Sequence, residues 1–218
     1  HNSKVIVFGI GGVGSFVVEA LTRAGVGNLI LVDNDTICIS NINRQIHARQ
    51  STVGMIKVEA MKERVISINP NCNVEAKQVF ITAENISEII PSDVDYVVDA
   101  IDTVTSKLAL AEYCYKNNIN IISSMGTGNK IDPTQFRVSD VFKTKVCPLA
   151  KVMRYELRKR GVKKLKVVYS EEMPMTPDKG RAVPSQKRQT PGSISFVPPV
   201  AGMIIGGEVI KDLTGLNK

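Results

Sequence analysis

The feature that most limits how this chain can fold is a glycine cluster between an apolar run and a helical pattern. Residues 5–10 read as a short buried strand that runs into the glycines of residues 9–14. Apolar and small residues then recur near helical spacing up to Gly25, which is typical of a helix C-cap. Residues 29–32 form a second apolar run that closes on Asp33. A strand, a tight turn, a helix and a strand of this length predict a parallel crossover unit.

The alternation of strand and helix patterns continues to about Gly126. An amphipathic pattern ends at Asn69-Pro70, because the residue before a proline disfavours helical backbone. Strands that alternate with helices in this way are typical of a parallel sheet with helices on both faces. We therefore expect an α/β fold with a Rossmann-like, doubly wound, mostly parallel sheet. The further elements predicted are helices at 53–68 and 104–115 and strands at 74–80, 94–100 and 119–124.

Beyond Gly126 the pattern is less regular and predicts a C-terminal extension of the same domain. It contains a strand near 136–138 and a strongly basic helix at 149–160. Residues 171–193 hold four prolines and little apolar content, so we expect a mobile loop there. A strand at 194–197 and a closing helix at 199–213 follow. The spacing of Gly202 and Gly206 in that helix permits close helix packing, either in the core or at a subunit interface.

The net charge of +7 is concentrated in one segment. Residues 143–188 hold 14 of the 28 lysines and arginines and four acidic residues, which gives this segment +10 and the remainder −3. Clustered cations of this kind bind phosphates and indicate a nucleic-acid partner, although a solvated helix face with a basic loop gives the same pattern.

The chain has no pattern of a membrane or disulfide-rich protein. Its longest apolar stretch, residues 194–207, is shorter than the ~20 residues that cross a bilayer, so we expect no integral membrane segment. The four cysteines lie far apart, without a C-x-x-C pair, and no secretory leader precedes the first strand. These observations predict a cytoplasmic protein without structural zinc.

The glycine cluster also predicts a nucleotide site. Glycines let the backbone approach a phosphate, the following helix N-terminus attracts anions, and an acid at the end of the second strand accepts hydrogen bonds from ribose hydroxyls. Asp33, which lies 19 residues after Gly14, has that position. The motif alone leaves a nicotinamide dinucleotide and ATP open. The residues of this predicted site are Gly9, Gly11, Gly12, Gly14, Ser15 and Asp33.

The residues after Asp33 favour ATP. Asp35 and Asn41 follow closely, and Arg44 and Lys57 add two cations. Converging cations suit a triphosphate, whose oxygens gain charge during transfer, whereas hydride transfer has no such need.

Asp102 follows the predicted strand at 94–100, at the carboxyl edge of the sheet, where open α/β folds bind ligands. A carboxylate there is suited to hold Mg²⁺ against phosphates. The alternative is a helix cap, because Asp102 and Thr103 precede a predicted helix.

Taken together, these motifs resemble the ubiquitin-activating-type superfamily, which includes the molybdopterin-synthase and thiamine-biosynthesis adenylyltransferases. Within it the chain is most similar to the tRNA threonylcarbamoyladenosine dehydratase branch, over nearly its whole length. The residues that carry the superfamily resemblance are 11–15, 31–33, 40–45, 53–57 and 100–102, and those that carry the branch resemblance are 43–48, 68–70, 100–102, 131–135 and 189–198.

The resemblance implies roles for the site residues. Asp33 would bind ribose, Asn41, Arg44 and Lys57 the phosphates, and Asp102 Mg²⁺ and the departing pyrophosphate, so that Arg44, Lys57 and Asp102 would be catalytic. The enzyme would adenylate the carboxylate of threonylcarbamoyladenosine in the tRNA anticodon loop, and the neighbouring carbamoyl group would close a ring with loss of water. The expected assembly is a homodimer, with sulfur-transfer proteins as possible partners. The expected organisation is one adenylation domain over 1–218, with a nucleotide-binding core at 1–126 and a substrate and dimerisation part at 127–218.

Three other functions stay open at this point. The first is adenylation of a ubiquitin-like sulfur-carrier protein, although enzymes of that kind usually hold zinc with two C-x-x-C pairs, which this chain lacks. The second is an NAD-dependent oxidoreductase, which shares only the glycine motif and Asp33. The third is a non-catalytic RNA-binding module with a relict nucleotide site.

Overall fold

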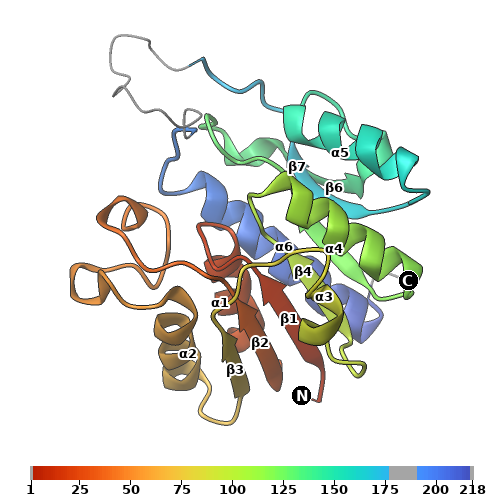
Figure 1. The fold of residues 1–218 in the computed structure, drawn as a ribbon. Helices are drawn as coiled ribbons and strands as arrows, with labels where there is room; N and C mark the ends of the chain where they lie inside the picture. Colours follow the sequence, from red (N-terminus) through yellow and green to blue (C-terminus); the bar gives the residue numbers. More distant parts are fainter. Residues whose placement is uncertain (1, 177–190, 217–218) are drawn as a thin grey trace.

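The computed structural model describes residues 2–176 and 191–216, and a seven-stranded sheet runs through their centre (Figure 1). The strand order is β3-β2-β1-β4-β5-β7-β6, and only the pair β6 and β7 is antiparallel. The chain winds outward from β1 to one edge and then from β4 to the other, which confirms the predicted Rossmann-like, doubly wound sheet. The strands are β1 (Lys4–Phe8), β2 (Asn28–Val32), β3 (Asn73–Lys77), β4 (Tyr96–Asp99), β5 (Ile121–Ser124), β6 (Phe136–Asp140) and β7 (Lys166–Ser170).

Helices cover both faces of the sheet, and successive residues of β1 show why its sequence is apolar throughout. Val5 and Val7 join the core under α1, α2 and α6, whereas Ile6 and Phe8 join the core under α3 and α4. A strand that is buried on both faces needs apolar side chains at every position. The helices are α1 (Gly14–Arg23), α2 (Lys57–Ile68), α3 (Ile86–Ile89), α4 (Val104–Lys116), α5 (Pro148–Lys159) and α6 (Val197–Thr214).

The small residues of α6 pack against α1 in the same chain. A Cβ on Gly202 would lie 2.4 Å from the carbonyl oxygen of Val13, and one on Gly206 would lie 2.6 Å from Cβ of Ala20. Only glycine permits this approach of two helix backbones. The sequence left open whether Gly202 and Gly206 pack in the core or at a subunit interface, and the structure shows them packed in the core against α1.

Two sequence predictions differ from the structure. The predicted helix at 53–68 begins only at Lys57, and Val53 and Ile56 lie in the irregular segment before it. The predicted strand at 194–197 is wrong, because residues 194–196 are irregular and Val197 is the first residue of α6. Prolines at the start of a helix are favourable, since the first turn needs no intrahelical N–H donors, and Pro198 and Pro199 start α6 in this way.

The C-terminal part completes the sheet of the N-terminal part. β7, which the sequence analysis did not predict, pairs with β5 on one side and β6 on the other. The ends of the predicted loop at 171–193 are attached to residues 129–132: the N–H of Ile131 donates to Glu172 Oε1 (2.8 Å) and that of Gly192 to Asn129 Oδ1 (2.7 Å). Residues 177–190 of this loop lie outside the described residues. Over residues 2–176 and 191–216, no helix has the length and apolar character needed to cross a membrane.

Candidate active site

The glycine turn joins the carboxyl end of β1 to the amino end of α1 and is very tight. Gly9 has φ +85° and donates its N–H to the carbonyl of Val32 (2.8 Å). A Cβ on Gly14 would lie 1.8 Å from the carbonyl oxygen of Gly9, and one on Gly9 would lie 2.6 Å from that of Ala100. Glycine is therefore required at both positions, and the loop after β4 lies directly against the turn.

Asp33 is fixed beside this turn by two backbone donors. The N–H of Ile10 donates to Asp33 Oδ2 (2.7 Å) and that of Asp35 to Asp33 Oδ1 (2.9 Å). Burial raises the pKa of the Asp33 carboxyl, and the positive charge of Lys57 acts in the opposite direction. A fixed carboxylate at the end of β2 has the position from which ribose hydroxyls are bound in folds of this type.

Lys57, the first residue of α2, lies between two carboxylates of the β2 end. Its Nζ is 2.7 Å from Asp35 Oδ2 and 3.9 Å from Asp33 Oδ1. The Lys57 side chain is buried, whereas that of Asp35 is more than half exposed. The Lys57 ammonium is therefore held beside Asp33 and Asp35 at the carboxyl end of β2.

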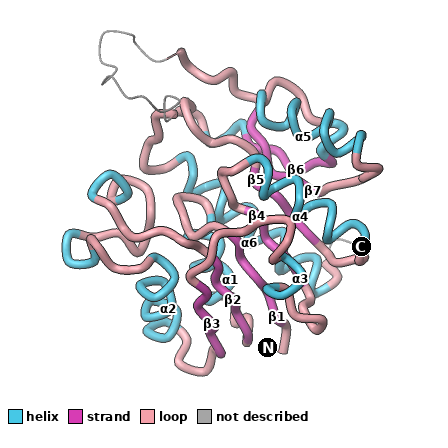
Figure 2. Tube along the Cα trace, in the orientation of Figure 1, coloured by secondary structure: helices cyan, strands magenta, loops and turns pink. Residues whose placement is uncertain are grey.

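Arg44 lies over the glycine turn, on the long segment between β2 and α2, which is loop apart from short helical turns at Ile39–Asn41 and Gln50–Thr52 (Figure 2). Its Cγ and Cδ are 3.2 Å and 3.3 Å from the position of a Cβ on Gly12. The guanidinium donates to the carbonyl of Ser40 (2.7 Å) and to Asn43 Oδ1 (2.8 Å). No carboxylate among the described residues forms an ion pair with it. Arg44 is thus a cation at the turn whose charge is not neutralised.

Asn41 and Ser15 shape the same segment. Asn41 Oδ1 accepts the N–H of Cys38 (3.0 Å), which holds the start of the segment in a short helical turn. Ser15 is buried on α1, and its Oγ accepts the N–H of Ile46 (3.3 Å). Both residues position the backbone that carries Arg44.

Asp102 lies in the loop after β4, two residues beyond Ala100, which contacts the glycine turn. Its carboxylate is exposed and accepts only a hydrogen bond from Thr103 Oγ1 (3.4 Å) among the described residues. Thr103 is the N-cap residue of α4 by position, but it makes no side-chain cap hydrogen bond. Asp102 therefore lies near the glycine turn, and the described structure shows no bond from it to Arg44 or Lys57.

Comparison with known proteins identifies the family of this chain. The model of the ThiF family matches residues 1–218. The chain belongs to the ThiF family. A Bacillus subtilis protein named tRNA threonylcarbamoyladenosine dehydratase is 47% identical over 97% of this chain and 87% of that protein. A Haemophilus influenzae protein of the same name is 50% identical over 73% of this chain and 61% of that protein.

The solved structures include similar members of this family. The structure of Escherichia coli tRNA N6-threonylcarbamoyladenosine dehydratase in complex with ATP superposes with a TM-score of 0.88 and 35% sequence identity. The match covers 99% of this chain and 87% of that one. The strand order and the helix layers of this chain are therefore those of a ThiF-family fold.

Gln45 is a further candidate site residue, which the sequence analysis did not select. It is buried, and its Nε2 lies 3.9 Å from the position of a Cβ on Gly11. Its Oε1 has no hydrogen-bond partner among the described residues. A buried acceptor without a partner is costly unless a ligand supplies the donor. The only sequence signal for this residue was its side-chain amide, at the end of the polar run Ser40–Gln45. That signal does not predict that the side chain is buried.

Asp99 and Lys107 form a second pair that the sequence did not reveal. Their side chains are fully buried and 2.9 Å apart, and Ser123 Oγ donates to Asp99 Oδ2 (2.5 Å). Asp99 Oδ1 also accepts the N–H of Ile101 (3.1 Å). This network lies directly beneath the loop that carries Asp102 and fixes its start.

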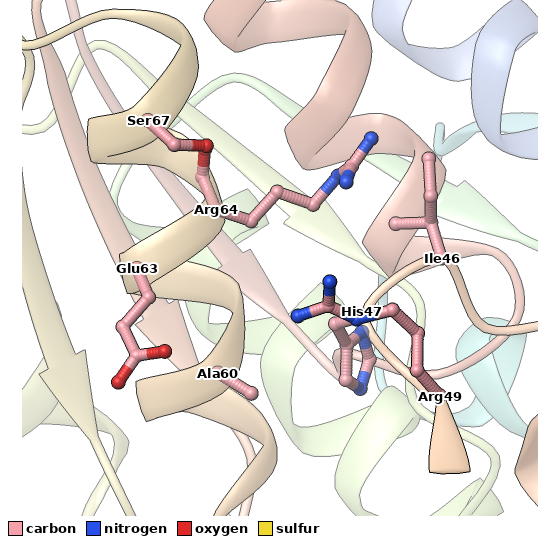
Figure 3. A pocket seen from close by; sticks show the side chains of 7 residues that line it. All are labelled: Ile46, His47, Arg49, Ala60, Glu63, Arg64 and Ser67. Atoms are coloured by element: carbon pink, nitrogen blue, oxygen red, sulfur yellow. The ribbon is translucent and has the colours of Figure 1, made fainter. Parts of the chain in front are cut away.

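Neither of two cavities in the structure is lined by the glycine turn. One, of about 770 Å³, is lined by Tyr96, Ile121 and Lys166, the first residues of their strands, and so lies at the opposite end of the sheet. The other, of about 280 Å³, lies between α2 and residues 46–49 (Figure 3). The described residues contain no group of three or more metal-ligating side chains of His, Cys, Asp or Glu. The candidate active site is therefore identified by its chemistry and not by its volume.

Proposed function

We propose that this chain is an ATP-dependent tRNA threonylcarbamoyladenosine dehydratase that adenylates the carboxylate of its modified adenosine. The observation that carries the proposal is the placement of Asp33, Lys57 and Arg44 around one glycine turn, in a chain whose relatives bear that name over most of its length. A hydride-transfer enzyme has no use for two cations at this position, which disfavours the NAD-dependent alternative.

The residues of the crevice fit ATP. Within residues 2–176 and 191–216, Gln45 offers an unpaired buried acceptor at the turn, and Arg44 offers a cation without a carboxylate partner. In the proposed complex, Asp33 accepts hydrogen bonds from ribose hydroxyls, while Arg44, Lys57 and Asn41 bind phosphate oxygens. Asp35 keeps Lys57 in place for this contact, as their 2.7 Å ion pair indicates.

Asp102 fits Mg²⁺ in the way usual for nucleotide enzymes. One or two carboxylates and the substrate phosphates commonly hold this ion, together with waters, and no dedicated protein cage is needed. An exposed carboxylate with a single weak internal hydrogen bond satisfies that requirement. When bound, Mg²⁺ neutralises charge on the phosphates.

The proposed chemistry has two steps. The threonyl carboxylate attacks the α-phosphorus of ATP, a new P–O bond forms, and pyrophosphate leaves with the electrons of the broken bond. Arg44 and Lys57 stabilise the charge that develops on the phosphates. The carbamoyl group then attacks the activated carbonyl carbon, loses a proton and expels AMP, which closes a ring. Because both reacting groups belong to one nucleoside, proximity supplies much of the rate.

The basic surface of α5 supports an RNA substrate. Lys151 and Arg158 on this helix are exposed, as are Lys163 and Lys164 just after it. We further propose that the enzyme acts in the cytoplasm as a homodimer and that sulfur-transfer proteins are among its partners. The family resemblance supports these three points, and light scattering of the purified protein tests the dimer.

The deciding experiment is mass spectrometry of digested tRNA. Threonylcarbamoylated tRNA, ATP, Mg²⁺ and the purified chain are expected to give a nucleoside lighter by one water, and omission of ATP is expected to abolish the change. Unchanged tRNA, together with pyrophosphate exchange that a Gly-Gly-ended carrier protein stimulates, would instead assign the chain to carrier adenylation. Tight binding of NAD that ATP does not displace would assign it to the oxidoreductases.

A further inference from the structure

The smaller cavity contains a buried histidine whose ring is not satisfied by the protein. His47 is only 3% exposed, and neither Nδ1 nor Nε2 has a hydrogen-bond partner among the described residues. Both nitrogens of an imidazole normally find partners when they are buried, because an unpaired polar atom costs free energy. The ring lines a cavity of about 280 Å³, slightly below the usual range of small-molecule sites, ~300–1,000 Å³.

Two arginines line the same cavity. Figure 3 shows Arg49 and His47 on the loop side and Arg64 extending across from α2, while the Glu63 carboxylate points away from them. The part of the chain that the structure describes gives Arg49 no carboxylate partner. A guanidinium that faces a small polar cavity is a strong donor to an oxyanion.

The charges around the cavity favour an anion. Arg64 donates to Glu19 (2.7 Å and 3.0 Å), and Arg23 donates to the same carboxylate (2.7 Å). Glu19 is thus shared by the guanidiniums of Arg23 and Arg64. Burial is the main cause that lowers the pKa of His47 to about 4, and the positive charges of Lys57 and Arg64 lower it further.

We propose that this cavity binds a phosphate-sized oxyanion, with His47, Arg49 and Arg64 as donors. Its walls are α2, which begins with Lys57, and residues 46–49, which continue the segment that carries Arg44. A bound anion therefore joins the two segments that supply cations to the nucleotide crevice. The anion is either free phosphate or a phosphodiester of an RNA backbone.

Isothermal titration of the whole chain with inorganic phosphate, in chloride buffer at constant ionic strength, tests the proposal. Saturable binding is expected, and Arg49→Ala and His47→Phe are each expected to weaken it by about tenfold or more, because each removes a donor to the anion. Lys62→Ala is the matched control, since it removes a cation from the same helix as Arg64 at a position that does not line the cavity. Arg49 is exposed, so its variant is expected to fold even if His47→Phe does not, and circular dichroism checks this.

Dimethyl phosphate in place of inorganic phosphate distinguishes the two sources. Binding of both anions, weakened by Arg49→Ala, shows that the cavity accepts a phosphodiester such as that of an RNA backbone, and binding of inorganic phosphate alone shows that it accepts only the free ion. The proposal would be overturned by absence of saturable binding or by equal phosphate affinity of the wild type and Arg49→Ala. It would also be overturned if Arg44→Ala lost phosphate binding while Arg49→Ala kept it.

Discussion

The guanidinium of Arg44 is held by the carbonyl of Ser40 and the side chain of Asn43, and it has no carboxylate partner in the described structure. A cation that is positioned by neutral acceptors keeps its full charge for the substrate. Such preorganisation lowers the barrier of a phosphate-transfer reaction, because no partner has to be displaced when charge develops.

We therefore expect Arg44→Ala to slow adenylation strongly while the fold is kept. One preorganised donor to developing charge contributes roughly 3 kcal/mol, or about 100-fold or more in kcat. Pyrophosphate exchange measures the rate, and urea unfolding measures stability. Arg44→Lys should recover only part of the rate, since lysine lacks the planar fork of donors. A normal exchange rate in Arg44→Ala would remove this residue from the mechanism.

His47 predicts how stability changes with pH. Its pKa is lowered to about 4 in the folded chain, first by burial and then by Lys57 and Arg64. The unfolded chain takes up this proton near the ordinary value of about 6.5, so it binds more protons than the folded chain between pH 6.5 and 4. Stability attributable to His47 is fully present above pH 6.5 and falls as pH is lowered through this window, by up to about 1.4 kcal/mol per pH unit.

The measurement is the free energy of unfolding in urea, in chloride buffer, at several pH values from 7.5 to about 4. His47→Phe is expected to show a shallower decline than the wild type, and His47→Gln serves as a second variant that keeps a polar side chain. Parallel curves for all three proteins would show that His47 does not titrate differently on unfolding.

At the scale of elements, the contact of α6 with α1 depends on Gly202 and Gly206, whereas Gly207 in the same helix faces open space. A Cβ on Gly202 meets backbone of α1 at 2.4 Å, whereas one on Gly207 meets nothing within 4 Å. Gly202→Ala is therefore expected to lower the free energy of unfolding by about 1–3 kcal/mol through overpacking. Gly207→Ala, the matched control, should raise it by about 0.5–1 kcal/mol, because alanine favours helix. Urea unfolding of both variants tests this, and equal effects would contradict the packing described.

The elements that sequence patterns predicted are those with local signals. The turn at Gly9 to Gly14 and the acid at Asp33 follow from spacing alone, and the structure brings them together. β7 was missed because its apolar core, residues 167–169, is short and lies between Lys166 and the acidic pair Glu171 and Glu172, so its pairing with β5 and β6 decides its conformation. The burial of Gln45, Lys107 and His47 depends on segments distant in the sequence, and no local pattern records it.

At the scale of the whole molecule, a group of exposed lysines lies at the edge of the sheet formed by β7 and β6. Figure 1 shows α5 beside α4, above β6 and β7. Lys151, Lys163 and Lys164 are exposed there and take part in no ion pair within the described structure. Lysines that form no ion pair with the protein can bind phosphate backbones, because binding releases counterions.

We expect a variant with all three of these lysines changed to alanine to bind tRNA more weakly and with a smaller salt dependence. Each lost phosphate contact lowers the slope of log K against log salt by about 0.7–0.9. Filter binding at several salt concentrations measures the slope, and ATP affinity serves as the control because these residues lie outside the crevice. An unchanged salt slope would show that tRNA binds elsewhere.

The packing of α6 on α1 has a consequence for synthesis of the protein. The helix that follows the glycine turn has its main apolar partner far later in the sequence, in α6 (Val197–Thr214). On the ribosome, the amino-terminal strands can pair early, but one face of α1 stays exposed until residues 197–214 have been synthesised and released. Nascent chains halted before Val197 should therefore be captured by chaperones and cut by proteases at α1, and release of α6 should end both.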